Sequence, residues 1–287
     1  MTETVPASVL VPTIGRVELL RSMLLSVARC DPRPEEVLVV DQSDGDELTR
    51  AARSVPGLAV RVVPCDGRGA ARARNVGLRE AGNDLVLCTD DDCIVASDWV
   101  GRGVKHLGDD PAAIYTGRVL ATRSPERTPS IRDIVDRRDF TGTLSCSALF
   151  TNNMAVHRSR ILEMDGFDER LPTAEDNDLC YRWLRSGGTL RYEPDMVVWH
   201  HDWRNPRDLA RLHIEYARGQ GMFYAKHLRG GDVAVLRFIG SDLYQWARSL
   251  AIAAITGRPA WSDWRRAIPR GLPSGFLTGW RTFRGST

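Results

Sequence analysis

The sequence of 287 residues lacks a long apolar run, a Cys-x-x-Cys pair and an internal repeat. Its longest apolar stretch, Leu250 to Ile255, is far shorter than the roughly 20 residues that a helix needs to cross a bilayer. The N-terminus also lacks the basic and apolar segments of a secretory signal. The six cysteines are dispersed, which argues against a disulfide framework or a zinc site. These absences predict a cytoplasmic protein in a reducing compartment.

The charges are unevenly distributed along the chain. The formal net charge is only +2, yet residues 204–287 contain 14 of the 39 Lys and Arg residues and only 5 of the 37 Asp and Glu residues. The tail therefore has a balance of +9, and the first 203 residues have a balance of −7. A basic tail on an acidic body indicates an anionic partner for the tail, either a membrane surface or a nucleic acid.

Short apolar runs alternate with amphipathic segments in the first two thirds of the chain. We interpret as strands the residues 7–12, 36–41, 60–63, 85–88 and 113–120. We interpret as helices the residues 19–27, 70–81, 158–164 and 176–186. Such alternation predicts a parallel sheet with helices on both faces. The polar stretch 121–142 is expected to be a loop or a segment that orders on binding. From residue 208 onward the sequence is rich in basic residues and has the pattern of helices.

The most informative motif is the run of three aspartates at positions 90–92, directly after the predicted strand at residues 85–88. Three adjacent like charges repel one another, and a hard divalent cation that accepts carboxylate oxygens would offset that repulsion. Ligands of an open α/β sheet also gather at the carboxyl ends of its strands. The run therefore indicates a metal site, whereas its alternative interpretation is a solvated acidic turn.

Other groups of residues are compatible with a nucleotide-sugar site. Asp41 ends the second predicted strand, where it either contacts a base or ribose or forms a turn. Residues 67–75 place a glycine loop and three arginines at a helix start, which suits a diphosphate as well as a solvated basic helix. Residues 174–179 place three acids at another helix start, where they serve as caps or supply a general base. His200 and His201 follow an apolar run, and one imidazole would complete a carboxylate metal site.

Taken in order, these residues resemble the inverting family 2 glycosyltransferases of GT-A fold. The resemblance covers about residues 5–203 and rests on residues 9–13, 41, 73–77, 90–92, 166–169, 175–176 and 200. It implies an α/β fold of GT-A type, Rossmann-like with a mostly parallel central sheet flanked by helices, followed by a C-terminal helical extension. It also implies a nucleotide-diphospho-sugar donor, Mg²⁺ or Mn²⁺ held at an Asp-x-Asp motif, and transfer to a hydroxyl with inversion.

The resemblance implies roles for individual residues. The donor-binding residues would be Pro12, Thr13, Asp41, Arg72, Arg74, Asp90, Asp91 and Asn153. Asp92 would be the metal ligand proper, with His200 or its neighbour His201 as a further contact. Asp176, with Glu175 beside it, would be the catalytic base.

The expected domains combine this resemblance with the helical, basic character of the chain after residue 208. Residues 1–205 would form the catalytic domain, with nucleotide-sugar binding up to about residue 110 and the acceptor side in residues 111–205. Residues 206–287 would form a basic helical extension, in which residues 233–257 carry an apolar stripe at helical spacing. This stripe indicates either an interfacial helix on anionic lipid at the inner face of the membrane, a subdomain packed on the core, or a homodimer interface. We expect no nucleic-acid partner.

Two other classes of protein remain as alternatives. A sugar-phosphate nucleotidyltransferase also uses an α/β sheet with acidic metal ligands, but it normally carries a glycine-rich loop with a basic residue after the first strand, of which residues 12–16 are only a thin version. A non-catalytic nucleotide-sugar binding protein is disfavoured by the intact acids at residues 90–92 and 175–176. The sequence leaves open the donor base, its sugar and the acceptor, which is a glycan, a lipid-linked saccharide or a natural product.

Overall fold

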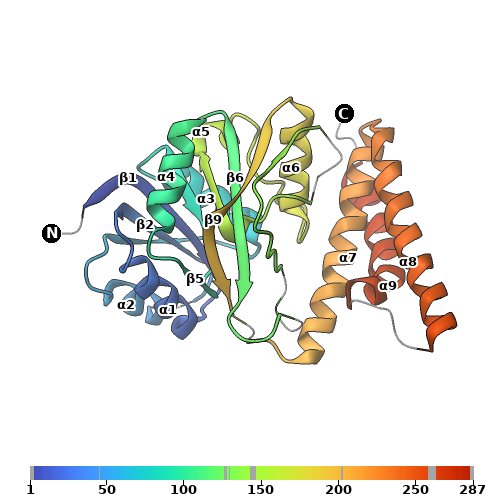
Figure 1. Cartoon of the computed structure of the whole chain (residues 1–287), viewed down its shortest axis with the longest axis horizontal. Helices are drawn as coiled ribbons and strands as arrows, with labels where there is room; N and C mark the ends of the chain where they lie inside the picture. Colours follow the sequence, from blue (N-terminus) through green and yellow to red (C-terminus); the bar gives the residue numbers. More distant parts are fainter. Residues whose placement is uncertain are drawn as a thin grey trace. The chain divides into compact units, whose positions relative to one another are not determined.

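The computed structural model describes residues 3–44, 46–125, 128, 130–142, 147–201, 203–257 and 263–284. The chain divides into two compact units. The first unit comprises residues 1–169 and 176–203, and the second comprises residues 170–175 and 204–287. Figure 1 colours the chain along its sequence, from blue at the N-terminus to red at the C-terminus.

The first unit is built around one β-sheet. Its strands among the described residues are β1 (Thr4–Thr13), β2 (Arg33–Asp41), β3 (Val60–Pro64), β4 (Leu85–Cys88), β5 (Cys93–Val95), β6 (Ala113–Ala121), β7 (Arg138–Phe140), β8 (Met154–His157) and β9 (Thr189–His200). Their order across the sheet is β3-β2-β1-β4-β8-β6-β9-β5, and β7 pairs with β9. Continuous apolar runs such as residues 9–11 form central strands because both faces of the sheet are covered.

The sheet is mixed and mostly parallel. β1 pairs in parallel with β2 and β4, and β2 pairs in parallel with β3. β8 runs antiparallel to both β4 and β6, and β5 and β7 run antiparallel to β9. The predicted α/β class with a mostly parallel sheet is therefore confirmed, and the antiparallel strands β5, β7 and β8 are ones that the sequence analysis did not assign. Strand periodicity alone does not distinguish the two directions.

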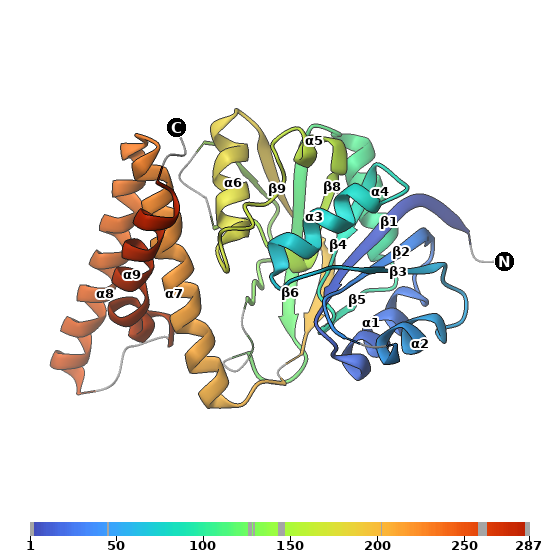
Figure 2. The ribbon, with the colours of Figure 1, turned by 180° about the vertical axis from the view of Figure 1, so that it is seen from behind.

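Helices cover both faces of this sheet. They are α1 (Val17–Val27), α2 (Glu47–Arg53), α3 (Ala70–Glu80), α4 (Trp99–Asp109), α5 (Arg158–Leu162) and α6 (Glu175–Arg185). Successive side chains of β1 point to opposite faces. Val9 packs in one core cluster with Leu20 of α1 and Trp99 of α4, whereas Leu10 packs in the other cluster with Leu78 of α3. Accordingly, α1 and α4 lie in front of the sheet in Figure 1, and α3 lies in front of it in Figure 2.

The segment after β6 is more ordered than the sequence predicts. Residues 121–142 were expected to form a loop or a segment that orders on binding. In the structure, Val119 and Arg132 form an antiparallel bridge and β7 joins the sheet beside β9. Arg132 also donates from Nη2 to the carbonyl oxygen of Ser147 at 2.9 Å. Backbone pairing therefore fixes the second half of this segment. Residues 126, 127, 129 and 143–146 lie outside the described part of the chain.

The cysteines that the structure describes are free thiols in the protein interior. They are Cys30, Cys65, Cys88, Cys93 and Cys180. Burial raises the pKa of Cys30 to about 11 and the pKa values of Cys88 and Cys180 to about 12, because a thiolate would lose its hydration. These three side chains therefore act as small hydrophobic groups. Cys146 lies outside the described residues.

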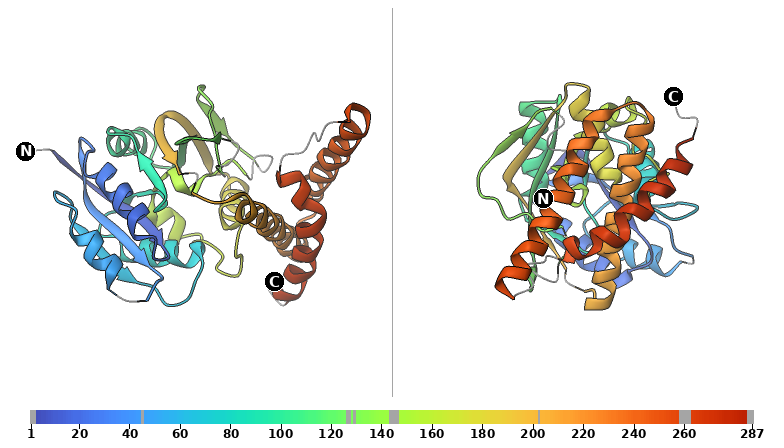
Figure 3. Two further views of the ribbon diagram at one scale, coloured as in Figure 1. Left: turned by 90° about the horizontal axis from the view of Figure 1, so that it is seen from below. Right: turned by 90° about the vertical axis from the view of Figure 1, so that its right-hand side faces the viewer.

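The second unit is helical. It contains α7 (Pro206–Arg229), the short 3-10 helix η4 (Val233–Val235), α8 (Leu236–Thr256) and α9 (Asp263–Thr282), drawn in orange to dark red in Figure 3. α7 starts at a cap in which the Asn205 side chain accepts from the backbone N–H groups of Arg207 and Asp208 at 3.0 Å each, with Pro206 in the first turn. No helix in the described part of the chain is long and apolar enough to cross a membrane.

Glycines allow α7 and α9 to pack backbone to backbone. Gly271, Gly275 and Gly279 recur at every fourth position of α9. A Cβ atom on Gly275 would lie 2.6 Å from the carbonyl carbon of Arg218, and one on Gly279 would lie 2.7 Å from Cα of Met222. Both distances are well inside van der Waals contact, so no side chain fits at these positions without a shift of the helices.

This packing predicts that Gly275→Ala destabilises the second unit. The added methyl group must push α9 away from α7, at a cost of about 1–3 kcal/mol. Thermal unfolding followed by circular dichroism should show a lower Tm than that of the wild type. Gly240→Ala in α8 is the matched control, because a Cβ there meets no atom within 4 Å and alanine favours a helix by about 1 kcal/mol. An unchanged Tm for Gly275→Ala would contradict the close packing.

Candidate active site

The carboxyl ends of three parallel strands meet at one edge of the sheet. β1 pairs in parallel with both β2 and β4, and Thr13 lies opposite Asp41 where β1 and β2 end. The aspartates at residues 90–92 follow β4, and the backbone N–H of Thr89 donates to the carbonyl oxygen of Leu10 at 3.1 Å. The structure thus brings Thr13, Asp41 and the aspartate run to the edge where α/β sheets bind ligands.

Arg16, just before α1, neutralises two of these aspartates. Its Nη2 lies 2.5 Å from Oδ1 of Asp91, its Nε donates to Oδ2 of Asp91 at 3.1 Å, and its Nη1 donates to Oδ2 of Asp92 at 3.2 Å. Thr13 donates from Oγ1 to Oδ2 of Asp91 at 2.6 Å. Asp91 and Asp92 are 0% and 2% exposed. Two adjacent buried carboxylates therefore share one guanidinium as their counter-charge.

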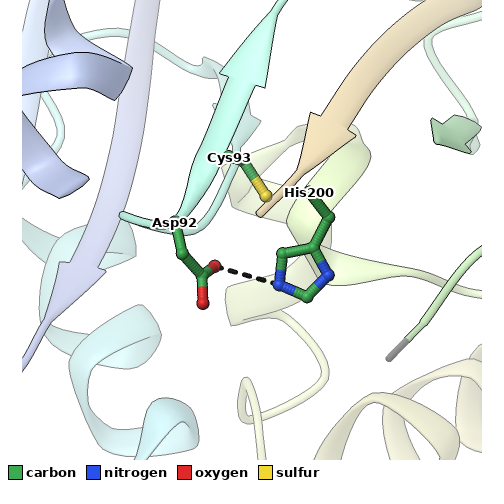
Figure 4. A group of neighbouring side chains, drawn as sticks. All are labelled: Asp92, Cys93 and His200. Atoms are coloured by element: carbon green, nitrogen blue, oxygen red, sulfur yellow. Dashed lines mark ion pairs between the residues drawn. The ribbon is translucent and has the colours of Figure 1, made fainter. Parts of the chain in front are cut away.

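Asp92 has further partners at the end of β9. The antiparallel pairing of β5 with β9 sets Cys93 opposite His200, next to Asp92 in the chain. His200 Nε2 lies 3.1 Å from Oδ1 of Asp92 (Figure 4), and Trp203 donates from Nε1 to Oδ2 of Asp92 at 2.8 Å. The Trp203 ring also lies 5.1 Å from the guanidinium carbon of Arg16. Cationic and N–H groups thus surround the Asp92 carboxylate.

Burial and charge shift the pKa values of these two aspartates in opposite directions. Burial raises the pKa of Asp91 to about 6, although Arg16 and Thr13 favour its anion. Burial also acts to raise the pKa of Asp92, but the hydrogen bond and charge of His200, together with Arg16 and Trp203, outweigh it. The pKa of Asp92 consequently lies well below its ordinary value. Asp92 is ionised across the physiological range, whereas the raised pKa of Asp91, about 6, lies closer to that range.

The group around Asp92 has the composition of a divalent-cation site. Ligand atoms of Asp92, Cys93 and His200 lie within 4.8 Å of one another. Figure 4 draws these three side chains. Burial raises the pKa of the Cys93 thiol well above its ordinary value, so its sulfur is a poor ligand. An ionised carboxylate and a neutral imidazole suit Mn²⁺, and Mg²⁺ accepts the carboxylate. The residues fit the implied ion, and the roles of Asp92 and His200 as its ligands stay a prediction.

A second acidic group in the first unit is already compensated. His106 Nε2 lies 2.8 Å from Oδ1 of Asp195, and Glu193 completes a cluster of three ligand types. Arg102 pairs with Asp195 at 3.3 Å and Arg137 pairs with Glu193 at 3.0 Å. Protein cations therefore balance these acids.

Of the two arginines predicted to bind the donor, Arg74 lies in the site. Arg74 is 3% exposed and donates from Nη2 to Oδ1 of Asp90 at 3.1 Å, so α3 and the end of β4 are joined by an ion pair. Arg72 is exposed at the start of α3 and lies 3.6 Å from Glu169. Arg72 thus pairs with Glu169 rather than with an aspartate of residues 90–92, and its guanidinium is accessible to an anion from solvent.

At the same edge, the Asp41 side chain stabilises a turn, and Pro12 lies within the pairing of β1 with β2. Oδ1 of Asp41 accepts from the backbone N–H of Ser43 at 2.9 Å and from its hydroxyl at 2.6 Å. This is a turn stabilised by an aspartate side chain, one of the two interpretations that the sequence left open. Pro12 lies opposite Val40 in the pairing of β1 with β2. A donor contact by either residue stays a prediction.

Asn153 joins three elements through its side-chain amide. It accepts from Trp99 Nε1 at 2.9 Å, and it donates to the carbonyl oxygens of Arg118 at 3.0 Å and Met196 at 2.9 Å. The residue is 0% exposed. Its amide is committed to holding α4, β6 and β9 together, so the geometry does not favour the predicted direct contact with a sugar.

The predicted base residues lie in the first turn of α6. Ala174, directly before the helix, has φ of 65°, a left-handed conformation that is unusual for alanine. Glu175 is 8% exposed and belongs to the second unit, while Asp176 is half-buried and belongs to the first. Oδ1 of Asp176 accepts from the backbone N–H of Asn177 at 2.8 Å. The positive end of the helix macrodipole favours a carboxylate at both positions.

Sequence reasoning missed the roles of Arg16 and Trp203. The signal for Arg16 was present, because a basic residue directly after β1 must lie near acids that follow the neighbouring β4. No sequence pattern indicated that Trp203 would contact Asp92, because the position of Trp203 depends on where β9 ends. The structure also separates the two histidines: His200 reaches the carboxylate of Asp92, whereas His201 donates its backbone N–H to the carbonyl oxygen of Asp92 at 2.9 Å. The geometry therefore favours His200 as a ligand.

Comparison with known proteins identifies sequence relatives. The pattern of the family described as Glycosyl transferase family 2 matches residues 8–183. A pre-mycofactocin glycosyltransferase of Mycobacterium tuberculosis is 26% identical over 289 residues, covering 83% of this chain and 61% of that protein. An uncharacterized glycosyltransferase of Bacillus subtilis, YwdF, is 31% identical over 101 residues, covering 35% of this chain and 37% of that protein. The chain thus spans about three fifths of the length of the mycobacterial relative.

Solved structures share the fold. The mannosyltransferase PcManGT of Pyrobaculum calidifontis, in complex with GDP-Man and Mn²⁺, aligns with a TM-score of 0.65 at 21% identity, covering 96% of this chain and 86% of that one. TarS of S. aureus (residues 1–349, with UDP) aligns with a TM-score of 0.59 at 17% identity, covering 98% and 91%. At these identities the likeness concerns the fold, and it confirms a GT-A-like α/β fold followed by C-terminal helices.

The shared counter-charge predicts that Arg16→Gln destabilises the protein more at high pH than at low pH. Without the guanidinium, the pKa of Asp91 rises further above about 6. Near pH 5 the folded state then keeps this carboxyl protonated, whereas near pH 8 it must hold a second buried anion, at a cost on the order of 3 kcal/mol. Thermal unfolding in EDTA should show the larger loss of Tm at pH 8.

Arg21→Gln, an exposed position on α1, is the matched control and should leave Tm nearly unchanged at either pH. Equal losses of Tm at the two pH values in Arg16→Gln would contradict the role of Arg16 as the counter-charge of Asp91.

Proposed function

Because the chain belongs to glycosyl transferase family 2, we propose that it transfers a sugar from a nucleotide-diphospho-sugar to a hydroxyl group of an acceptor. The observation that carries the proposal is the compensated acidic edge of the sheet, where the ionised Asp92 lies beside His200 and Arg16. The names of its relatives support the donor class. PcManGT was solved with GDP-Man, and TarS was solved with UDP and with UDP-GlcNAc.

The donor would bind across the ends of β1, β2 and β4. Arg74 and the exposed Arg72, at the start of α3, would offer planar guanidinium groups to the diphosphate. Asp90, ion-paired with Arg74, would lie near the ribose, and Asp41 would lie near the base. Residues up to about 110 would thus bind the nucleotide sugar, and residues 111–205 would form the acceptor side.

Thr13, Asp91 and Asn153 would assist the donor from a distance. Thr13 and Asp91 fix Arg16 at the edge of the sheet, and Asn153 fixes the strands beside it. Their hydrogen bonds hold charged groups in place before the substrate arrives, so little reorganisation is needed in the transition state.

Asp92 and His200 would hold Mg²⁺ or Mn²⁺. Such an ion, when bound, supplies a Lewis acid that stabilises the negative charge of the departing nucleoside diphosphate. The low pKa of Asp92 keeps its carboxylate available as a ligand at any physiological pH. Arg16 adds a fixed positive charge at the same edge, which also favours a phosphate-bearing leaving group.

Asp176 would be the general base. It would accept the proton of the acceptor hydroxyl while that oxygen attacks the anomeric carbon from the side opposite the leaving diphosphate, so a single displacement inverts the configuration. Its place in the first turn of α6 favours the carboxylate form that this role requires. Glu175, buried beside it, would orient this turn.

A binding screen tests the metal role of Asp92. Nucleoside diphosphates with Mn²⁺ should raise the Tm of the wild type, because a ligand at about 100 times its Kd adds roughly 2.7 kcal/mol to folding stability. Asp92→Asn should lose the part of the shift that depends on Mn²⁺. Asp109→Asn, an exposed aspartate on α4, is the control and should keep it. An unchanged metal-dependent shift in Asp92→Asn would refute the assignment, and the most stabilising diphosphate names the donor base.

A turnover measurement tests Asp176. With the donor identified by the screen and water or glycerol as acceptor, Asp176→Asn should release nucleoside diphosphate about 10²–10⁴-fold more slowly while its donor Kd stays unchanged. Glu163→Gln, an exposed acid after α5, should turn over normally. A kcat within about tenfold of the wild type would exclude Asp176 as the base. Release of pyrophosphate instead would indicate a nucleotidyltransferase.

A further inference from the structure

Helix α8 turns its apolar stripe outward. Leu236, Leu243 and Leu250 are 53%, 47% and 40% exposed, and Ala247 and Ala254 on the same stripe are exposed as well. The spacing of seven, four, three and four residues places all five side chains on one face of the helix. A helix at a protein surface normally buries such a face.

The opposite face of α8 is hydrogen-bonded to the other helices of the second unit. Asp242 accepts from the hydroxyl of Tyr224 in α7 at 2.7 Å. Ser249, which is 0% exposed, accepts from Nη1 of Arg265 in α9 at 2.8 Å. Gln245 accepts from Nη2 of the same arginine at 3.5 Å. Polar side chains therefore fix the orientation of α8, and these contacts hold the apolar stripe on the outside.

Among the residues of α8 and α9 whose side chains the structure describes, the exposed charged ones are all arginines. Exposed arginines on these helices and directly after α9 are Arg237, Arg248, Arg266, Arg270, Arg281 and Arg284. Asp242 is the sole acid of α8, where it faces Tyr224, and Asp263, the first residue, is the sole acid of α9. Leu277 and Trp280 on α9 are 59% and 41% exposed. Exposed apolar side chains and exposed arginines thus both occur on α9, and tryptophan and arginine favour membrane interfaces.

We propose that α8 and α9 dock on the surface of a membrane that contains anionic lipid. The apolar stripe of α8 would enter the interface between headgroups and acyl chains, and the arginines would lie at the level of the lipid phosphates. Charge complementarity selects this occupant over a second copy of the chain, because two copies joined through this face would bring their arginines together. The docking does not depend on the proposed sugar transfer, since no residue of the acidic edge takes part.

Co-sedimentation of the full chain with vesicles tests the docking. Binding to vesicles of phosphatidylcholine with phosphatidylglycerol should exceed binding to phosphatidylcholine alone by about tenfold or more, and added salt should reduce it. The double variant Leu243→Gln/Leu250→Gln should lose most of the binding, and Arg270→Gln/Arg281→Gln should lose its dependence on anionic lipid. The control Val135→Gln, 67% exposed in the first unit, should bind as the wild type does.

Three outcomes would overturn the proposal. The first is the same binding of the wild type to both kinds of vesicle, or none to either. The second is unchanged binding of Leu243→Gln/Leu250→Gln, which must keep the Tm of the wild type to count as folded. The third is a wild type that binds no vesicles and is a dimer in light scattering, with the dimer lost in the Leu243→Gln/Leu250→Gln variant. That result would assign the face to a second copy of the chain. The thermal-shift screen for nucleoside diphosphates gives an independent result, so failure of docking and failure of sugar transfer are distinguishable.

Discussion

The arrangement of the acidic edge depends on how two buried, adjacent carboxylates are compensated. Asp91 and Asp92 together would be untenable in the interior without Arg16, because isolated buried anions cost several kcal/mol each. The compensation divides the pair: Asp91 has a raised pKa, while Asp92, with His200 as an additional partner, remains an anion. The same edge thus holds one carboxylate that stays ionised and another whose pKa is raised although Arg16 and Thr13 favour its anion.

The sequence predicted the parts of this protein that follow from local periodicity. The buried strands β1, β2 and β4 have uninterrupted apolar runs, and α1 and α3 have apolar side chains at helical spacing, so their existence and order could be inferred. The ends of parallel strands meet at one edge by rule, which brought the aspartates together with Thr13 and Asp41. Strand direction was not predictable at β8, because direction depends on the path of the connecting chain rather than on side-chain alternation.

The residues that sequence reasoning misjudged are those whose role depends on distant partners. Asn153 has an amide side chain that could bind a ligand. Its three hydrogen bonds, however, are made with Trp99, Arg118 and Met196, which are far apart in sequence. Trp203 reaches Asp92 across more than a hundred positions. In α8 the sequence predicted the helical spacing of the apolar side chains, but it did not predict whether they face inward or outward. The contacts of Tyr224 and Arg265, in neighbouring helices, determine which side of α8 faces inward.

The buried thiols have a practical consequence for studying this protein. Alkylating reagents attack thiolates, and Cys30, Cys88, Cys93 and Cys180 keep their protons because burial raises their pKa values. Once Cys65, a free thiol that is 7% exposed, and Cys146, which lies outside the described residues, are replaced, the remaining thiols of the folded chain are these four, which gives a nearly blank background for site-specific labelling. A pair of introduced surface cysteines, one in each unit, would then carry spin labels or fluorophores and report the distance between the units in solution, with lipid or nucleotide added at will.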